Sequence, residues 1–160
     1  MVTKSWKKVG DTYYLFLNQE VVGSLHIHDY SHQVCEIKIK DKKYILTKTG
    51  RWLTGFKITD ESENEIGFAN AEKWYANNLG LSLNNETYKI EVRNNPLVEW
   101  YIIDSSGFEI ASCGMKATNS KIEVELNAKN TNLMLEFILW YLFLPIALEN
   151  FASDIPFTQP

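Results

Sequence analysis

The sequence predicts a mainly β protein: a closed, roughly twelve-stranded antiparallel barrel around a buried hydrophobic helix near the carboxy terminus. Two observations support this fold class. Before residue 130, apolar and polar residues alternate in short runs, as in strands that bury one face. After it, Leu133 to Leu148 is apolar all round, with Glu136 as its single charge. A helix without a polar face must be buried on every side, in a protein core or in lipid.

The predicted strands follow one another as hairpins. Polar segments such as Asn18-Gln19-Glu20 and Ser105-Ser106-Gly107 separate adjacent runs and suit tight turns. The alternating runs are Tyr13–Leu17, Val21–His28, Val34–Lys40, Lys43–Lys48, Arg51–Thr59, Glu65–Asn70, Tyr88–Val92, Leu97–Asp104, Phe108–Cys113 and Ile122–Leu126. A first strand near Trp6 and a short strand near Leu81 bring the number to about twelve. Repeated hairpins of this kind build sandwiches or barrels.

Two of these hairpins form a weak internal repeat. In each, a strand ends at an aspartate, a polar turn follows, and the next strand restarts at an aliphatic residue. Asp60 precedes Ile66 in the first copy, and Asp104 precedes Ile110 in the second. An aspartate side chain can accept hydrogen bonds from backbone amides two residues further on, so both residues are predicted to organise their turns.

The apolar helix has two candidate environments, a protein core and a membrane. Its sixteen residues at about 1.5 Å each reach about 24 Å, short of a hydrocarbon layer of about 30 Å. Glu136 shortens the uncharged part, and Pro145 removes a helix hydrogen bond near the end. No basic cluster follows, and the acidic tail argues against an anchor. We therefore expect burial in the core, with a membrane anchor as the alternative.

The helix and the strands are expected to form one unit. A twelve-stranded barrel is too wide for its inward side chains to fill, so an apolar helix along the axis would complete the core. The helix is predicted over about 132–149, with Asn132 as its amino-terminal cap. Glu136 lies near that amino terminus, where a carboxylate is favoured, and is expected to reach the barrel mouth.

Length and composition predict one globular domain over residues 1–160. Apolar residues make up 45% of the chain and charged residues 22%, which is ordinary globular usage. The net charge of −4 gives no general attraction to nucleic acid, so no nucleic acid partner is expected. Two cysteines are too few for a disulfide framework, and the first residues resemble no secretory signal. We expect a cytoplasmic protein, with or without peripheral contact with a membrane.

This layout resembles the tubby-like superfamily, which includes the tubby carboxy-terminal domain, the phospholipid scramblases and the plant LURP-one-related proteins. The resemblance rests on paired strands around turns such as Asp104-Ser105-Ser106-Gly107, on the Ile66-Gly67 restart and on the late apolar helix Leu133 to Leu148. It implies a closed twelve-stranded barrel around a carboxy-terminal helix. Tubby domains bind phosphoinositide headgroups through basic residues on adjacent strands, scramblases are membrane-associated, and the LURP-one group has no settled biochemistry.

A cluster of histidines resembles a metal site by composition. His26, His28 and His32 lie close to Cys35 in sequence. Strand alternation opposes a shared site, because Cys35 is predicted to face the core with Leu25, opposite His26 and His28. The acidic turn after Asp60 lacks the glycine and the terminal glutamate of a calcium loop. No metal is expected.

No motif for a catalytic nucleophile, a phosphate-cradling glycine loop, a Cys-x-x-Cys pair or a zinc-protease helix occurs in the sequence. We therefore expect no enzyme activity, no catalytic residue and no cofactor.

The charge distribution is uneven in one hairpin, which we call the basic hairpin, residues 36–51. It has six basic residues against Glu36 and Asp41, a local excess of four positive charges, and leaves −8 for the rest of the chain. The candidate ligand-binding residues are Lys38, Lys40, Lys42, Lys43, Lys48 and Arg51. On alternate strand positions, Lys38 and Lys40 are expected to share a face with Glu36. Lys42 and Lys43 at the turn and Lys48 on the returning strand are expected to lie close enough to converge on one phosphate-bearing group. The alternative is a solvated edge hairpin whose lysines prevent aggregation.

Three function classes follow. The leading one is a non-catalytic binding module whose candidate ligand is an anionic phospholipid headgroup or another phosphorylated group. The second is a structural or protein-interaction domain with no small ligand and an unknown protein partner. The third is a membrane-tethered, scramblase-like protein.

Overall fold

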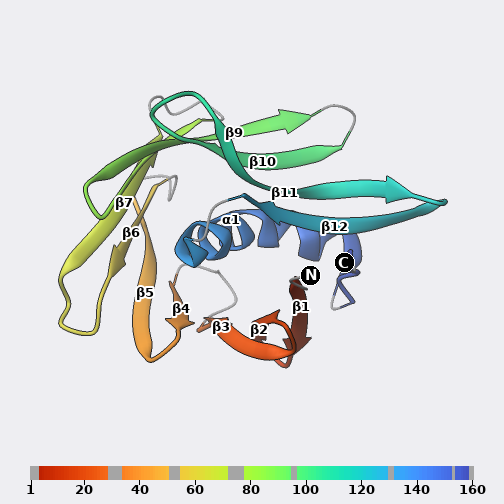
Figure 1. The fold of residues 1–160 in the computed structure, drawn as a ribbon, viewed down its shortest axis with the longest axis horizontal. Coiled ribbons are helices and arrows are strands. Elements are labelled where there is room, and N and C mark those ends of the chain that lie inside the picture. Colours follow the sequence, from red (N-terminus) through yellow and green to blue (C-terminus); the bar gives the residue numbers. More distant parts are fainter. Residues whose placement is uncertain are drawn as a thin grey trace.

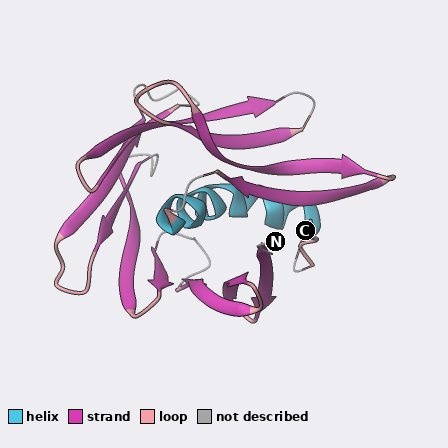
Figure 2. Cartoon of the chain, viewed as in Figure 1, coloured by secondary structure: helices cyan, strands magenta, loops and turns pink. Residues whose placement is uncertain are grey.

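The computed structural model describes residues 4–28, 34–50, 55–71, 78–94, 97–129, 132–152 and 154–158. They form twelve strands and a carboxy-terminal helix (Figures 1 and 2). The elements are β1 Lys4–Val9, β2 Thr12–Leu17, β3 Glu20–Ile27, β4 Val34–Ile39, β5 Lys42–Thr49, β6 Gly55–Thr59, β7 Glu65–Ala71, β8 Leu79–Leu83, β9 Glu86–Asn94, β10 Val98–Ile103, β11 Glu109–Thr118, β12 Lys121–Ala128 and α1 Leu133–Phe151. The mainly β fold with about twelve strands is confirmed.

The sheet is an antiparallel meander, in which each strand pairs with the next strand along the chain from β1 to β12. Figure 1 shows this sheet curving round α1. Alternate residues face the helix, so that Leu25 of β3, Ile37 of β4 and Leu46 of β5 are fully buried. Phe56 and Ile58 of β6 are buried in the same way, as their strand period predicts. Trp52 lies outside the described residues.

The internal repeat has the same backbone geometry in both copies. The Asp60 carboxylate accepts hydrogen bonds from the amides two and four residues on, each at 2.9 Å. The Asp104 carboxylate accepts the equivalent bonds at 2.9 and 3.0 Å. Glu63 and Gly107 occupy equivalent positions with positive φ, and the strand before each turn has a register shift near its end. Both aspartates therefore shape their turns as predicted.

The helix is buried in the core, as expected. The Asn132 side chain accepts a hydrogen bond from the Met134 amide at 3.1 Å and caps the first turn. The buried helix residues are Met134, Leu135, Glu136, Phe137, Ile138, Leu139, Trp140, Tyr141, Phe143, Leu144 and Ala147. α1 is long and apolar enough to span a membrane, but most of it packs inside the sheet. At Gly23 the sheet and helix approach closely, because a Cβ there would lie 2.7 Å from the Phe137 ring.

The sheet has two ends, and the closed barrel predicted from the sequence is only partly seen. Among the described residues, β1 and β12 end the strand order with no hydrogen-bonded ladder between them. Figure 1 places these two strands and both chain termini on the same side of the molecule. A carboxy-terminal tail, residues 154–158, lies there and forms a parallel bridge between Phe157 and Val124 of β12. We call the region between β1 and β12 the seam.

Candidate functional site

The basic hairpin is formed by β4 and β5, and its outer face is an ion-pair network. Lys38 of β4 stands opposite Lys43 of β5, and Glu36 lies on the same face. The Glu36 carboxylate is 3.4 Å from Lys38 Nζ, 3.1 Å from Lys43 Nζ and 3.4 Å from His28 Nε2. Partial burial raises the pKa of Glu36, but hydrogen bonds and attraction from Lys43 and Lys38 together lower it below its usual value. The carboxylate therefore stays ionised and offsets one of the two lysine charges.

The described basic residues of the hairpin do not converge on one point. Lys48 is five residues from Lys43, so the two side chains leave β5 on opposite faces. The Lys48 ammonium lies 6.0 Å from the centroid of the Tyr141 ring of α1, on the inner side of the sheet. Lys40 lies in the turn with a positive φ, off the strand alternation that would place it beside Lys38. The expected convergence is therefore wrong for Lys48, and the face expected to be shared with Lys38 is wrong for Lys40. Arg51 lies outside the described residues.

Lys40 instead lines a small cavity of about 240 Å³ where α1 begins, which we call the mouth cavity. The lining residues are Ile39, Lys40, Tyr44, Ile66, Asn84, Asn132, Leu133 and Met134. The cavity thus combines a lysine, an asparagine side chain, a tyrosine and the amino-terminal turn of a 19-residue helix. The amino end of a helix has a partial positive charge from its aligned peptide dipoles. The cavity therefore suits a small anionic group.

Charges near the mouth cavity have both signs. Lys40 and Lys42 form no ion pair with any residue that the structure describes, whereas Lys38 and Lys43 share Glu36. Asp41 lies between Lys40 and Lys42 in the turn. The Glu61 carboxylate accepts a hydrogen bond from the Lys43 amide at 2.9 Å. The local positive field is therefore modest.

Glu136 does not reach the mouth, contrary to the sequence-based expectation. Its side chain is 0% exposed, and one carboxylate oxygen lies 2.6 Å from Lys4 Nζ of β1. The other carboxylate oxygen has no hydrogen-bond partner among the described residues. Burial raises the pKa of Glu136, and the Lys4 ammonium only partly opposes that shift. The residue sits one turn into a helix enclosed by the sheet, and this enclosure explains why it points at β1 rather than into solvent.

The histidine cluster has the opposed faces predicted from strand alternation. The rings of His26 and His28 lie 5.1 Å apart, and His26 Nδ1 is 2.9 Å from the Thr12 hydroxyl. Cys35 is fully buried with the core, and burial raises the pKa of its thiol far above the usual value. His32 lies outside the described residues. Across the described ranges, no three histidine, cysteine or acidic side chains are arranged to hold a metal ion.

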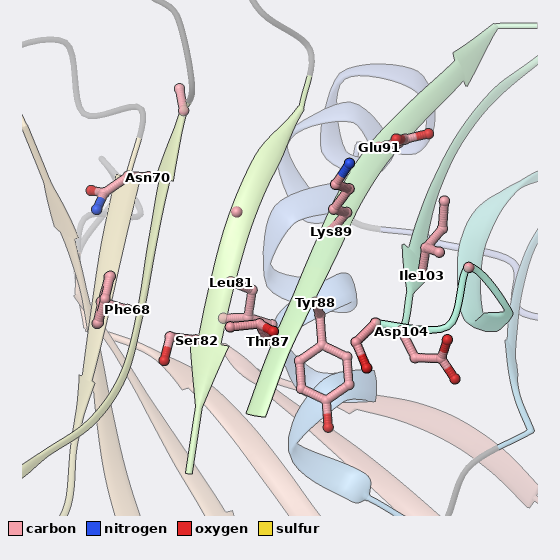
Figure 3. A pocket seen from close by; sticks show the side chains of 14 residues that line it. Phe68, Asn70, Leu81, Ser82, Thr87, Tyr88, Lys89, Glu91, Ile103 and Asp104 are labelled. Atoms are coloured by element: carbon pink, nitrogen blue, oxygen red, sulfur yellow. The ribbon is translucent and has the colours of Figure 1, made fainter. Parts of the chain in front are cut away.

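A larger groove, which sequence reasoning did not predict, runs over β7, β8, β9 and the turn after β10. Its volume is about 860 Å³, and Figure 3 shows Phe68, Ser82, Lys89 and Asp104 among its lining side chains. Gly80 contributes no side chain to it, and a Cβ built there would meet nothing within 4 Å. An isolated glycine within an alternating strand was the one sequence signal for this groove.

The groove lining has one basic residue and two acidic residues. Lys89 is the basic residue, and Glu91 and Asp104 are the acidic ones. Glu91 accepts a hydrogen bond from the Tyr101 hydroxyl at 2.5 Å, and Asp104 is engaged by its own turn. Burial, followed by the hydrogen bond to Glu86, raises the pKa of Tyr88 to about 12. The hydroxyl therefore stays protonated at neutral pH, and the groove favours no single class of ligand.

Comparisons with known proteins identify no relative. No family model, no curated protein and no solved structure matches this chain.

Proposed function

We propose that this protein is a non-catalytic binding module that holds a small anionic group, such as a phosphorylated headgroup, in the mouth cavity. The observation that carries the proposal is the lining of that cavity by Lys40, Asn84 and the capped first turn of α1. Lysine side chains and helix amino termini both favour phosphate groups. A volume of about 240 Å³ is below the usual range for drug-sized ligands, so it fits a phosphate-bearing group better than a large molecule.

Within the basic hairpin, the proposal assigns unequal roles to the lysines. Lys40 lines the cavity, and Lys42 is an exposed cation beside it. Lys38 and Lys43 contribute less, because Glu36 pairs with both and offsets one of their two charges. Since lysine binds phosphate as a point charge, and Asp41 lies in the same turn, binding is expected to be weak and strongly dependent on salt.

The finer identity of the fold is also a proposal. We propose a tubby-like barrel, supported by the twelve-stranded antiparallel meander and the apolar helix inside its curve. The absence of enzyme activity and a cytoplasmic location, with or without contact with a membrane, belong to the same proposal.

The test is vesicle binding by the full-length protein at low ionic strength. The vesicles contain phosphatidylcholine with or without a phosphoinositide, and a soluble inositol phosphate is titrated in parallel. Lys40→Glu with Lys42→Glu is expected to abolish binding to the phosphoinositide vesicles. The matched control, Lys38→Glu with Lys43→Glu, makes the same change in charge on the hairpin's outer face and is expected to retain most of the binding.

The outcomes separate the function classes. Binding to vesicles but not to the soluble inositol phosphate indicates a lipid surface, whereas binding to both indicates the phosphorylated headgroup itself. Equal losses in the two charge variants would show that general charge, and not the mouth cavity, carries the binding. No binding by the wild type would replace this proposal with the protein-interaction domain.

A further inference from the structure

The free edge of β12 already accepts an extended segment, which is the chain's own tail. The Val124 amide donates to the Pro156 carbonyl at 2.7 Å, and the Thr158 amide donates to the Val124 carbonyl at 2.9 Å. These two bonds make the parallel bridge between Val124 and Phe157. The outward backbone groups of β12 at this point are therefore accessible to a strand that runs in the same direction.

Prolines at residues 156 and 160 remove two of the donors that would extend this pairing. In a parallel ladder, alternate residues of a strand use the same edge, so Ile122 and Leu126 would offer the next backbone groups. In register, their carbonyls would need N–H groups from residues 156 and 160. Both are prolines, which have no N–H. No further backbone bond joins the described tail to β12.

Besides these backbone bonds, the Ile155 and Phe157 side chains of the tail pack against the core. The Phe157 ring lies 5.0 Å from Trp140 of α1 and 6.4 Å from Trp6 of β1, measured between ring centroids. Phe157 therefore covers the aromatic core at the seam. The indole N–H groups of Trp6 and Trp140 are buried and have no acceptor among the described residues. Hydrogen-bonding capacity is thus unused on both tryptophans that the ring contacts.

Space remains on both sides of the tail. A cavity of about 440 Å³ lies between Lys4–Trp6 of β1 and residues 124–128 of β12. Another, of about 520 Å³, lies between residues 154–157 of the tail and residues 6–10 around the end of β1. The seam is therefore only partly filled by its present occupant.

We propose that the seam binds an extended segment of a partner protein by β-strand addition along β12. The segment places an aromatic side chain where Phe157 lies, and its backbone N–H groups pair where the tail has proline. Strand addition draws affinity from main-chain hydrogen bonds and specificity from side-chain pockets, and both are present here. A second copy of this chain is a poorer occupant, because its tail would bring the same two prolines. The proposal uses none of the residues of the mouth cavity.

The test uses three labelled eight-residue peptides and fluorescence anisotropy. The first has the sequence of residues 153–160, the second replaces both prolines with valine, and the third also replaces the phenylalanine with alanine. The proteins are the full-length wild type and full-length Phe157→Ala, in which the tail competes less. Each restored hydrogen bond should raise the affinity about fivefold. The second peptide, which restores two, should therefore bind Phe157→Ala about 25-fold more tightly than the first. The third should bind at least tenfold more weakly than the second.

Hydrogen exchange shows where the peptide binds. Because it is measured in the wild type as well as in Phe157→Ala, the result does not depend on correct folding of the variant. The second peptide is expected to slow exchange at the Leu126 amide in both proteins, at higher peptide concentration for the wild type. The full-length variant Pro156→Val with Pro160→Val should slow the same amide with no peptide added. Its residue 160 amide can donate to the Leu126 carbonyl, and this bond holds the Thr158 carbonyl in register to accept from the Leu126 amide. Equal binding of the three peptides, or unchanged exchange at Leu126 in every arm, would overturn the proposal. Concentration-dependent dimerisation through the tail would instead assign the seam to a second copy.

Discussion

Removing the ammonium of Lys4 is expected to leave an uncompensated charge inside the protein. Glu136 is fully buried, and Lys4 Nζ, at 2.6 Å, is the partner of one carboxylate oxygen. Breaking a buried ion pair from one side costs about 3–5 kcal/mol. The Lys4 side chain is 28% exposed, so the cost of Lys4→Met should lie near the lower end of this range. We expect the substitution to lower the free energy of unfolding by about 3 kcal/mol at pH 7.5.

The cost should depend on pH with a defined sign. Burial raises the pKa of Glu136, and in Lys4→Met the opposing ammonium is gone, so the pKa rises further. A raised pKa in the folded state means that protonation favours folding. The contribution of the protonated Glu136 carboxyl to the free energy of unfolding is therefore fully present below the carboxyl's unfolded pKa, about 4.3. This contribution is lost as the pH rises through the folded-state pKa. Near pH 4.5 the cost of Lys4→Met should fall to about 1 kcal/mol, because a protonated Glu136 then loses only a hydrogen bond and not an ion pair.

The assay is urea unfolding followed by tryptophan fluorescence at several pH values from 4.5 to 8. Lys7→Met is the matched control: it makes the same change on the same strand at an exposed residue, and should stay within about 0.5 kcal/mol of the wild type. Lys4→Met combined with Glu136→Leu should recover to within about 1 kcal/mol, because no charge then remains buried. A cost that is the same at both ends of the pH range would refute the reasoning.

Three further predictions concern the core. Leu139→Ala, at a fully buried helix position, should cost about 2–5 kcal/mol in denaturant unfolding, and Leu142→Ala, at a partly exposed position, should cost less; equal costs would contradict the helix orientation. Gly23→Ala should cost about 1–3 kcal/mol, because its Cβ would collide with a helix ring, whereas Gly80→Ala should lie within about 0.5 kcal/mol; thermal melts compare the two. Both cysteines are buried, and burial raises the pKa of each thiol, so a thiol reagent should modify Cys35 only after urea unfolds the protein; prompt reaction would argue against that burial.

Local patterns predicted most of the fold. Strand period identified the buried residues of β4 and β6, and the aspartate turns were recognised because one side chain organises each turn locally. The burial of α1 followed from the absence of a polar face. Closure was harder to predict, because whether β1 meets β12 depends on the curvature summed over all strands and not on the sequence of either strand.

The candidate site was predicted less well, for identifiable reasons. The sequence placed Lys40 beside Lys38, but the turn rotates Lys40 toward the helix instead. The interaction of Glu36 with two lysines depends on the cross-strand pairing of Lys38 and Lys43, which is fixed only when the hairpin register is known. The role of Phe157 required the placement of the tail, which has almost no periodic pattern.

The position of α1 after all the described strands has a consequence during protein synthesis. All twelve described strands precede the helix, so a ribosome makes every one of them before the first helical residue. Neighbouring strands can pair as they emerge, since every pairing in the meander is local. The inner face of the nascent sheet nevertheless stays uncovered until α1 leaves the exit tunnel. Folding is therefore expected to finish only after translation of the helix, and the unfinished sheet is a natural client for chaperones that bind exposed apolar strands.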